Sequence, residues 1–139
     1  GDEDAAVRVV EDLKFKMDEV VGVSVDPAYM RGFLADDRHY LVAAYVEDEP
    51  VGMLLGYRLL RLDGTPPLMF VWDLGVVEHH RRSGIGRALV EEAKRLGNED
   101  GCRSMLIPTE TSNEAAMALY RSAGGEQEGT DGTEFWWEW

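Results

Sequence analysis

The chain has 139 residues, 45% of them hydrophobic, which is enough for one packed core and predicts a single domain over residues 1–139. Its formal net charge of −13, from 27 acidic and 14 basic residues, argues against nucleic acid or an anionic membrane surface as a partner and favours a cationic one. No apolar run reaches the roughly 18 to 20 residues that span a bilayer, and no signal sequence is recognisable, so we expect a soluble, cytoplasmic protein.

Charge is unevenly distributed along the chain. Residues 110–139 carry seven acidic side chains and one basic side chain, whereas residues 79–95 carry five basic and two acidic ones. Two regions of opposite sign suggest two differently charged ligands, although acidity that only maintains solubility is the alternative. The single cysteine, Cys102, lies in an apolar stretch and is expected to be a buried structural thiol.

The first half of the chain predicts one helix between β-rich runs. Residues 7–10 are interpreted as a first strand, and Asp26 followed by Pro27 predicts the start of a helix that ends near residue 36. Two β-rich runs, at 39–46 and 51–60, flank a short polar connection and predict a hairpin. A turn at Asp63-Gly64 then leads to a long apolar strand over residues 68–77, which Asp73 interrupts.

The second half alternates helices and strands. Residues 84–100 have apolar side chains at helical spacing and predict an amphipathic helix, with Arg87/Glu91 and Glu91/Arg95 as ion pairs one turn apart. A short strand over 103–108, a helix capped by Ser112 and a final aromatic strand over 133–139 follow. The order β, α, β, β, β, α, β, α, β predicts an α/β (α+β) protein with a mixed sheet covered by helices.

The strongest chemical signal is the strand, loop and helix over residues 74–87. A helix that starts at Gly84 aims free backbone N–H groups at the loop, and Gly84 and Gly86 allow a ligand to approach the backbone closely. Three arginines add charge-assisted donors: Arg81, Arg82 and Arg87. The unit predicts an anion site suited to a pyrophosphate, while an exposed glycine-rich helix start without a ligand is the alternative.

Two motifs carry a family resemblance. Arg81-x-x-Gly84-x-Gly86 follows a strand containing Asp73-Leu74-Gly75-Val76, and Asn113-x-x-Ala116-x-x-Leu119-Tyr120-x-x-x-Gly124 comes later in the chain. Together they resemble the acetyl-CoA signature of the GNAT superfamily of N-acetyltransferases. Shorter runs, such as Trp72-Asp-Leu and Ala118-Leu-Tyr, further resemble the GNAT-type aminoglycoside 3-N-acetyltransferases.

The resemblance implies a GNAT fold and a set of cofactor contacts. We expect a mixed, mostly antiparallel sheet of about six to seven strands with about four helices, whose fourth and fifth strands splay apart to admit CoA. Main-chain groups of Leu74, Gly75 and Val76 would bind the pantetheine, and the Val76 N–H would polarise the thioester carbonyl. The pyrophosphate would be held by the loop that Arg81 supports, through Arg82, Ser83, Gly84, Ile85, Gly86 and Arg87.

Two further positions match family residues in the second motif. Asn113 corresponds to a pantetheine contact, and Tyr120 corresponds to the general acid that protonates the departing CoA thiolate. From the residue pattern alone, Tyr120 is also explained as a core aromatic on the apolar face of its helix.

Carboxylates are the candidates for binding the amine. A carboxylate in an apolar strand is costly unless it is paired or used, so Asp73 is the first candidate general base; a structural carboxylate satisfied by its neighbours is the alternative. Glu110, at the end of the next strand, is the second. Other acidic residues are predicted to contact the substrate: Asp36, Asp131 and Glu134. His79-His80 lacks the spacing and third ligand of a metal site, so no metal is expected.

These observations predict transfer of acetyl from acetyl-CoA to a primary amine of an aminoglycoside, at its 3-N position, by direct attack in a ternary complex. One alternative is a GNAT enzyme for a polyamine, a small amine or a protein amino group. A second alternative is a non-catalytic acyl-CoA-binding module. The resemblance also implies a homodimer.

Overall fold

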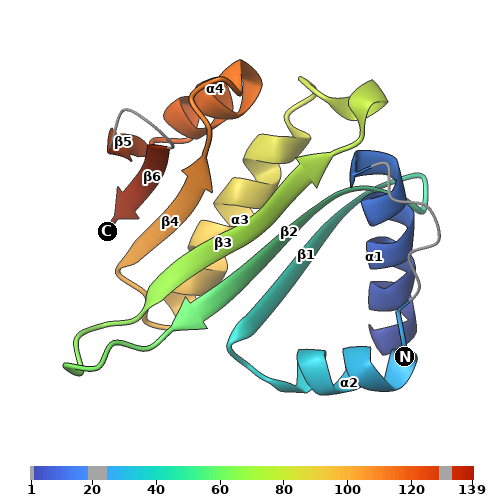
Figure 1. The fold of residues 1–139 in the computed structure, drawn as a ribbon, viewed down its shortest axis with the longest axis horizontal. Helices are drawn as coiled ribbons and strands as arrows, with labels where there is room; N and C mark the ends of the chain where they lie inside the picture. The colour runs from blue at the N-terminus through green and yellow to red at the C-terminus, as the bar shows by residue number, and fades with distance from the viewer. Residues whose placement is uncertain (1, 19–24, 129–132) are drawn as a thin grey trace.

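The computed structural model describes residues 2–18, 25–128 and 133–139, which form one layered α+β unit (Figure 1). The first half contains two helices and three strands: α1 (Asp2–Asp18), α2 (Pro27–Ala35), β1 (His39–Val46), β2 (Glu49–Leu59) and β3 (Leu68–Val76). The second half follows a short 3₁₀ turn, η1: α3 (Ile85–Glu99), β4 (Ser104–Thr109), α4 (Glu114–Ser122), β5 (Glu126–Glu128) and β6 (Thr133–Glu138).

All six of these strands belong to one sheet, in the order β1-β2-β3-β4-β6-β5. Within the described ranges, β3 and β4 are the parallel pair and the other neighbours are antiparallel. The predicted mixed, mostly antiparallel sheet with flanking helices is therefore confirmed. β5 was not anticipated, because its three residues, Glu126, Gln127 and Glu128, are all exposed and carry no apolar pattern.

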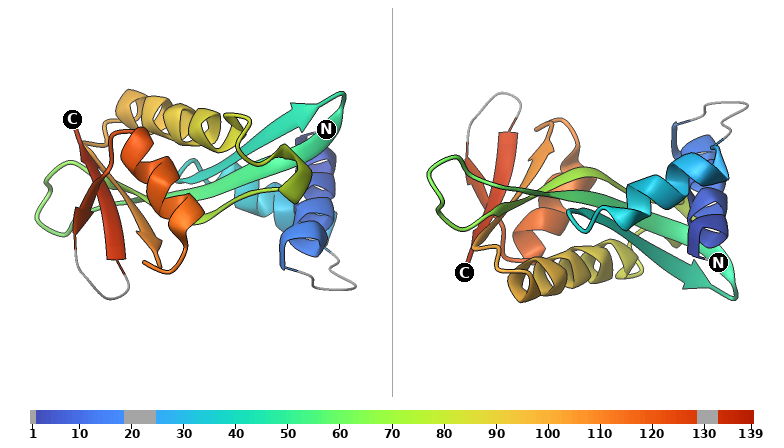
Figure 2. Two further views of the ribbon diagram at one scale, coloured as in Figure 1. Left: turned by 90° about the horizontal axis from the view of Figure 1, so that it is seen from above. Right: turned by 90° about the horizontal axis from the view of Figure 1, so that it is seen from below.

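Helices cover both faces of the sheet. α3 lies on one face and α1 with α2 on the other (Figure 2). On the α3 face, Leu89, Val90 and Ala93 are buried against core side chains that include Met69 of β3. A smaller cluster on the other face joins Val9 and Leu13 of α1 to Met53 of β2.

The prediction of a strand at residues 7–10 was wrong, because these residues lie within α1. The helix is explained by a longer spacing: Ala6, Val9 and Leu13, three and four residues apart, are all buried. The local run of valines indicates a strand only when it is considered without those neighbours. The predicted fourth strand is consequently the third, β3.

The predicted turns and caps were partly confirmed. Asp26 accepts a hydrogen bond from the Ala28 N–H at 3.0 Å and starts α2, as expected. The β1–β2 turn is shorter than predicted, because Glu47 and Asp48 adopt φ values of 51° and 67° and reverse the chain in two residues. The residue that caps α4 is Asn113, not Ser112.

The predicted ion pairs on α3 were also wrong. Arg95 instead binds Glu92 at 2.6 Å and Glu99 at 2.9 Å, and Lys94 approaches Glu91 at 3.5 Å. Three-residue spacings compete with four-residue ones on a helix, and both bring side chains together.

Candidate functional site

The most distinctive feature of the sheet is an opening between its two parallel strands. β3 and β4 pair only where Leu68, Met69 and Phe70 lie beside Ser104, Met105 and Leu106. Beyond these residues β3 continues to Val76 and β4 to Thr109, but the two strands no longer pair with each other. Their ribbons diverge toward α4 (Figure 1). The predicted separation of these strands is therefore confirmed.

Backbone polar groups of β3 face this opening. The Val77 N–H donates to the Val51 carbonyl at 2.8 Å, so the adjacent Gly52/Val76 pair is one whose members do not bond to each other. The N–H and C=O of Val76 consequently point away from β2 and toward the opening. The same alternation directs the N–H and C=O of Leu74 that way, and an extended ligand with amide groups fits such an edge.

Arg81 fixes the loop that follows β3. Its Nε donates to the Val76 carbonyl at 3.0 Å, which occupies that acceptor and leaves the Val76 N–H directed at the opening. The Ser83 hydroxyl donates to the His80 carbonyl, at the end of the 3₁₀ turn η1 (Glu78–His80). The first bond ties the loop to β3 and the second closes a turn within the loop, while the supporting role of Arg81 in cofactor binding stays a prediction.

The start of α3 has the features of an anion site. Gly84 precedes the helix with a φ of 89°, a conformation that favours glycine, and a Cβ added there would meet nothing within 4 Å. The first turn of α3 contains no acidic residue, and Arg82 and Arg87 are both exposed beside it. Helix dipole, free N–H groups and guanidinium groups all attract a phosphate.

The structure gives Gly86 a packing reason in addition to the predicted one. A Cβ at this position would lie 3.0 Å from Leu119 Cδ2 of α4, so the glycine permits close packing of the two helices. Its predicted contact with the pyrophosphate stays a prediction, as does that of Ile85.

Tyr120 lies on α4 and is 5% exposed. Its ring packs edge-on against Phe135 at 5.3 Å and Trp137 at 6.1 Å between centroids. Burial raises the pKa of its hydroxyl to about 12. The residue is thus a core aromatic that remains protonated at neutral pH, and its role as general acid stays a prediction.

Asn113 begins the same helix. Its side-chain oxygen accepts a hydrogen bond from the Ala116 N–H at 3.1 Å, so this oxygen caps the helix. The predicted contact with pantetheine would therefore use the side-chain amide nitrogen of Asn113.

Asp73 lies on the opposite face of the sheet from α3. Leu55 pairs with Asp73 and Gly56 with Val71, so β3 bulges at Trp72 and the register shifts. Asp73 is half-buried, and its charge is one of the causes, after burial and Tyr29, that raise the pKa of Tyr57.

Glu110 is exposed directly after β4. Leu106 is the last residue of β4 that pairs with β3, and Glu110 follows it by four positions. On β3 the last such residue is Phe70, and Asp73 follows it by three. The two candidate bases therefore flank the opening at a similar level along the strands.

The other acidic residues predicted to bind substrate do not lie on the two strands that border the opening. Asp36 ends α2 and binds Arg38 at 2.8 Å, and this hydrogen-bonded pair holds the pKa of its carboxyl well below the usual range. Glu134 is exposed on β6 and accepts a hydrogen bond from Trp136 Nε1 at 3.0 Å. Asp131 lies outside the described residues.

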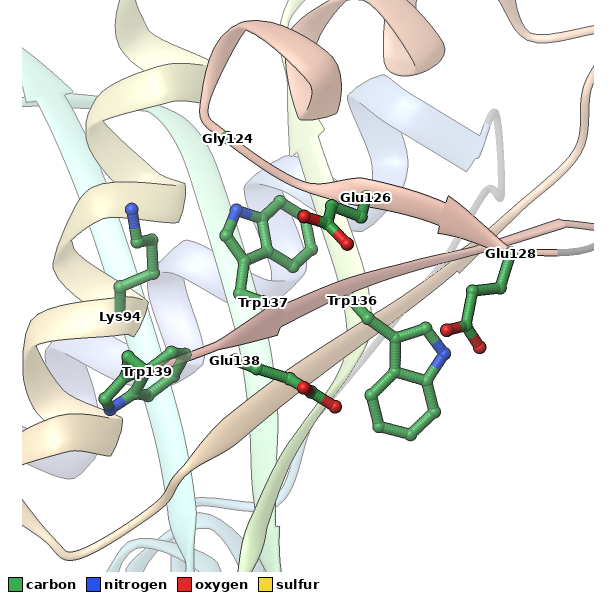
Figure 3. Close-up of a pocket in the computed structure, with 8 residues that line it drawn as sticks. All are labelled: Lys94, Gly124, Glu126, Glu128, Trp136, Trp137, Glu138 and Trp139. Atoms are coloured by element: carbon green, nitrogen blue, oxygen red, sulfur yellow. The ribbon is translucent and has the colours of Figure 1, made fainter.

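Two hollows lie away from this opening. The first, of about 470 Å³, is formed where β5 and β6 meet the middle of α3, and Figure 3 shows its lining: Lys94, Gly124, Glu126, Glu128, Trp136, Trp137, Glu138 and Trp139. The second adjoins it through Lys94 and Trp139. Because both are remote from Gly84 and from Asp73, we place the site at the opening.

In the ranges that the structure covers, no group of three or more His, Cys, Asp or Glu side chains is arranged to hold a metal ion. Cys102 is fully buried, and burial raises the pKa of its thiol. None of the described helices is both long and apolar enough to cross a membrane.

A splayed parallel pair, a backbone edge and an anion-binding helix start together define an acyl-CoA-dependent acetyltransferase fold. Comparison with known families agrees: the Acetyltransferase (GNAT) family model matches residues 6–124, and the chain belongs to this family.

Similar proteins include enzymes for different acceptors. The N-alpha-acetyltransferase RimI of Mycobacterium tuberculosis is 35% identical over 106 residues, which cover 73% of this chain and 61% of RimI. An aminoglycoside acetyltransferase, meta-AAC0020 from an uncultured soil sample, solved in complex with sisomicin, superposes with a TM-score of 0.80 at 22% identity, covering 93% of this chain and 86% of that one. A second soil aminoglycoside acetyltransferase, HMB0005, has a TM-score of 0.76 at 31% identity, covering 92% and 85%.

The chain is shorter than the first curated relatives that it matches. It spans 23% of an uncharacterised Mycobacterium leprae protein, 22% of an Arabidopsis thaliana chloroplastic GCN5-related N-acetyltransferase and 61% of RimI.

Proposed function

We propose that this chain transfers an acetyl group from acetyl-CoA to a primary amine of an aminoglycoside, at the 3-N position, by direct attack in a ternary complex. The observation that carries the acetyl-CoA half is the opening between β3 and β4, with the Leu74 and Val76 backbone on one side and the start of α3 after the loop that follows β3. Acetyl-CoA supplies the activated acyl group, and the residues described here bind and orient it.

The cofactor-binding residues divide into two groups. Leu74 and Val76 offer an extended backbone edge to the pantetheine, whereas the N–H and C=O of Gly75 between them are directed at Met53 of β2, so the contact predicted for Gly75 is not made through these groups; the Val76 N–H would donate to the thioester oxygen as negative charge develops there. The α3 start and the neighbouring Arg82, Ser83 and Arg87 bind the pyrophosphate. Arg81 positions both groups through its bond to the Val76 carbonyl.

Proton transfer is assigned to three side chains. Asp73 and Glu110 bind the ammonium from the two sides of the opening, and one of them accepts its proton directly or through water. Tyr120 donates a proton to the departing thiolate, since its hydroxyl is protonated at neutral pH. Attack by the free amine on the thioester breaks the C–S bond and requires no covalent enzyme intermediate.

An aminoglycoside acceptor is supported by charge and by likeness. The chain carries a net charge of −13, and aminoglycosides carry several ammonium groups. One of the similar solved structures is an aminoglycoside acetyltransferase at 31% identity, and another contains sisomicin.

A protein α-amino group is the second candidate. It is favoured by the 35% identity to RimI, an N-alpha-acetyltransferase. A polyamine acceptor or a non-catalytic acyl-CoA-binding module remains the outcome if neither acceptor reacts.

The test measures CoA thiol released from acetyl-CoA with gentamicin, spermidine or a peptide with a free N-terminus, at equal concentrations. We expect rapid release with gentamicin. Release with the peptide or spermidine alone would reassign the acceptor, and acetyl-CoA binding without release in any mixture would favour the non-catalytic module.

A further inference from the structure

Aromatic side chains gather on the face of the sheet that carries Asp73. Tyr57 of β2 lies opposite Phe70 of β3, and the Phe70 ring is 6.1 Å from that of Trp72. At the other end, the His39 ring lies 5.3 Å from Tyr57. Phe33 and Tyr29 of α2 complete this aromatic strip, since Phe33 stacks on His39 at 4.0 Å and Tyr29 acts electrostatically on Tyr57.

The strip differs from the core on the α3 face. Met69 and Val71, its neighbours on β3, are 0% and 2% exposed and belong to that core. Trp72 and Tyr29 are each 68% exposed. An indole that is mostly in water beside a carboxylate is not explained by folding stability, because little of its apolar surface is buried.

The bulge explains why Trp72 and Asp73 lie together. Consecutive residues of a regular strand point to opposite faces, but the extra residue in β3 breaks this alternation between Val71 and Asp73. An aromatic face and a carboxylate therefore sit side by side at the edge of the opening, next to the Leu74 and Val76 backbone. This stretch is the middle of β3 and follows Phe70, the last residue of β3 that pairs with β4.

The chemistry of this pair suits a ring that carries ammonium groups. The face of an indole bears negative quadrupole charge, which attracts cations and the C–H groups of a saturated ring beside a cation. A rigid six-membered ring also buries more apolar area on a flat aromatic surface than a linear polyamine segment does. It loses less conformational entropy when it binds. The strong negative charge of the chain adds a general attraction for such a ligand.

We propose that Trp72 is a specificity-determining residue, whose indole stacks on the sugar or cyclitol ring adjacent to the reacting amine, with Tyr29 extending the same platform at its outer end. This inference rests on the proposed function, since it identifies how an aminoglycoside is recognised there. Two aromatic residues of the C-terminal strand, Phe135 and Trp137, are buried in the core at 0% and 4% exposure and do not offer such a surface.

The test compares steady-state kinetics of the wild type with Trp72→Ala, Trp72→Phe, Tyr29→Ala and Tyr45→Ala. Tyr45 is the matched control, because it is 51% exposed but lies at the end of β1, two strands from β3. Trp72→Ala should raise the KM for gentamicin by about tenfold or more, and Trp72→Phe should recover most of the loss. The KM for acetyl-CoA should stay within about twofold, and Tyr45→Ala should match the wild type.

Each outcome has a separate meaning. If the wild type acetylates gentamicin but both Trp72→Ala and Tyr29→Ala keep its KM, the platform is wrong and the proposed function stands. If the wild type acetylates only spermidine or a peptide, the aminoglycoside function is wrong and the ring platform falls with it. An equal loss for gentamicin and spermidine in Trp72→Ala would contradict selection for rings.

Discussion

At the residue scale, Tyr120 is a packed core side chain for which we also propose a role in proton transfer. Its ring contacts Phe135 and Trp137, and the same burial raises the pKa of its hydroxyl to about 12. A group with that pKa holds its proton throughout the neutral range, so it can act as an acid and not as a base.

Tyr120→Phe keeps the ring and removes the proton. We expect the kcat for gentamicin to fall by about 10²- to 10³-fold, because general acid catalysis is lost, while the KM for acetyl-CoA changes little. The melting temperature of the variant serves as the control for packing. An unchanged kcat would show that the thiolate leaves without help from Tyr120.

The same variant tests the pKa of Tyr120 through stability. The folded-state pKa is raised above the ordinary value of 10, so the contribution is fully present below pH 10 and is lost as pH rises toward 12. Wild type should lose roughly 2 to 3 kcal/mol more than Tyr120→Phe over this window. Urea unfolding at each pH measures both proteins, and parallel curves would contradict the raised pKa. Tyr40, whose pKa is also raised by burial, titrates equally in both proteins.

At the element scale, two positions at the start of α3 hold glycine for different physical reasons. Gly84 needs a left-handed φ of 89°, whereas Gly86 makes room for Leu119. Sequence spacing cannot separate these causes, because the packing partner of Gly86 lies on another helix, 33 positions later.

Gly86→Ala should destabilise the fold by about 1 to 3 kcal/mol, because its new methyl group crowds Leu119 at 3.0 Å. Combining it with Leu119→Ala should recover part of the loss relative to the sum of the single variants. Gly32→Ala in α2 is the matched control, because nothing lies within 4 Å of a Cβ added at that position. It should stabilise the fold by up to about 1 kcal/mol. Additive behaviour of the double variant would contradict direct contact.

Several elements could be predicted because their signals are local. Asp26 and Pro27 mark the start of α2, and the apolar spacing of Leu89 and Ala93 marks α3. The errors arose where distant contacts decide: residues 7–10 form a helix because Val9 packs on Met53, and the bulge at Trp72 is set by pairing with β2. The exposed platform beside Asp73 was missed for that reason, although an aromatic before a strand carboxylate was visible in the sequence.

At the scale of the whole molecule, a strong negative net charge is combined with one arginine-rich segment. The net charge is −13, and residues 81–87 hold Arg81, Arg82 and Arg87. A field of this sign raises the local concentration of a polycation and is weakened by salt.

Salt should therefore weaken binding of the amine substrate more than it lowers the stability of the fold. Raising NaCl from about 0.05 M to 0.5 M should increase the KM for gentamicin severalfold, since the screening length falls from above 10 Å to about 4 Å. Unfolding free energy measured in the same buffers provides the control. A salt-independent KM would mean that short-range contacts alone hold the acceptor.

The incomplete pairing of β3 with β4 also has a mechanical consequence. Three residue pairs join the ribbon β1-β2-β3 to the ribbon β4-β6-β5, so much of the connection between them depends on side chains of α3 and α4. A pantetheine bonded along Leu74 and Val76 would serve as a strand donated by another molecule. CoA should then slow hydrogen exchange at those two amides and raise the melting temperature with its concentration, so that binding the substrate and finishing the sheet become one event.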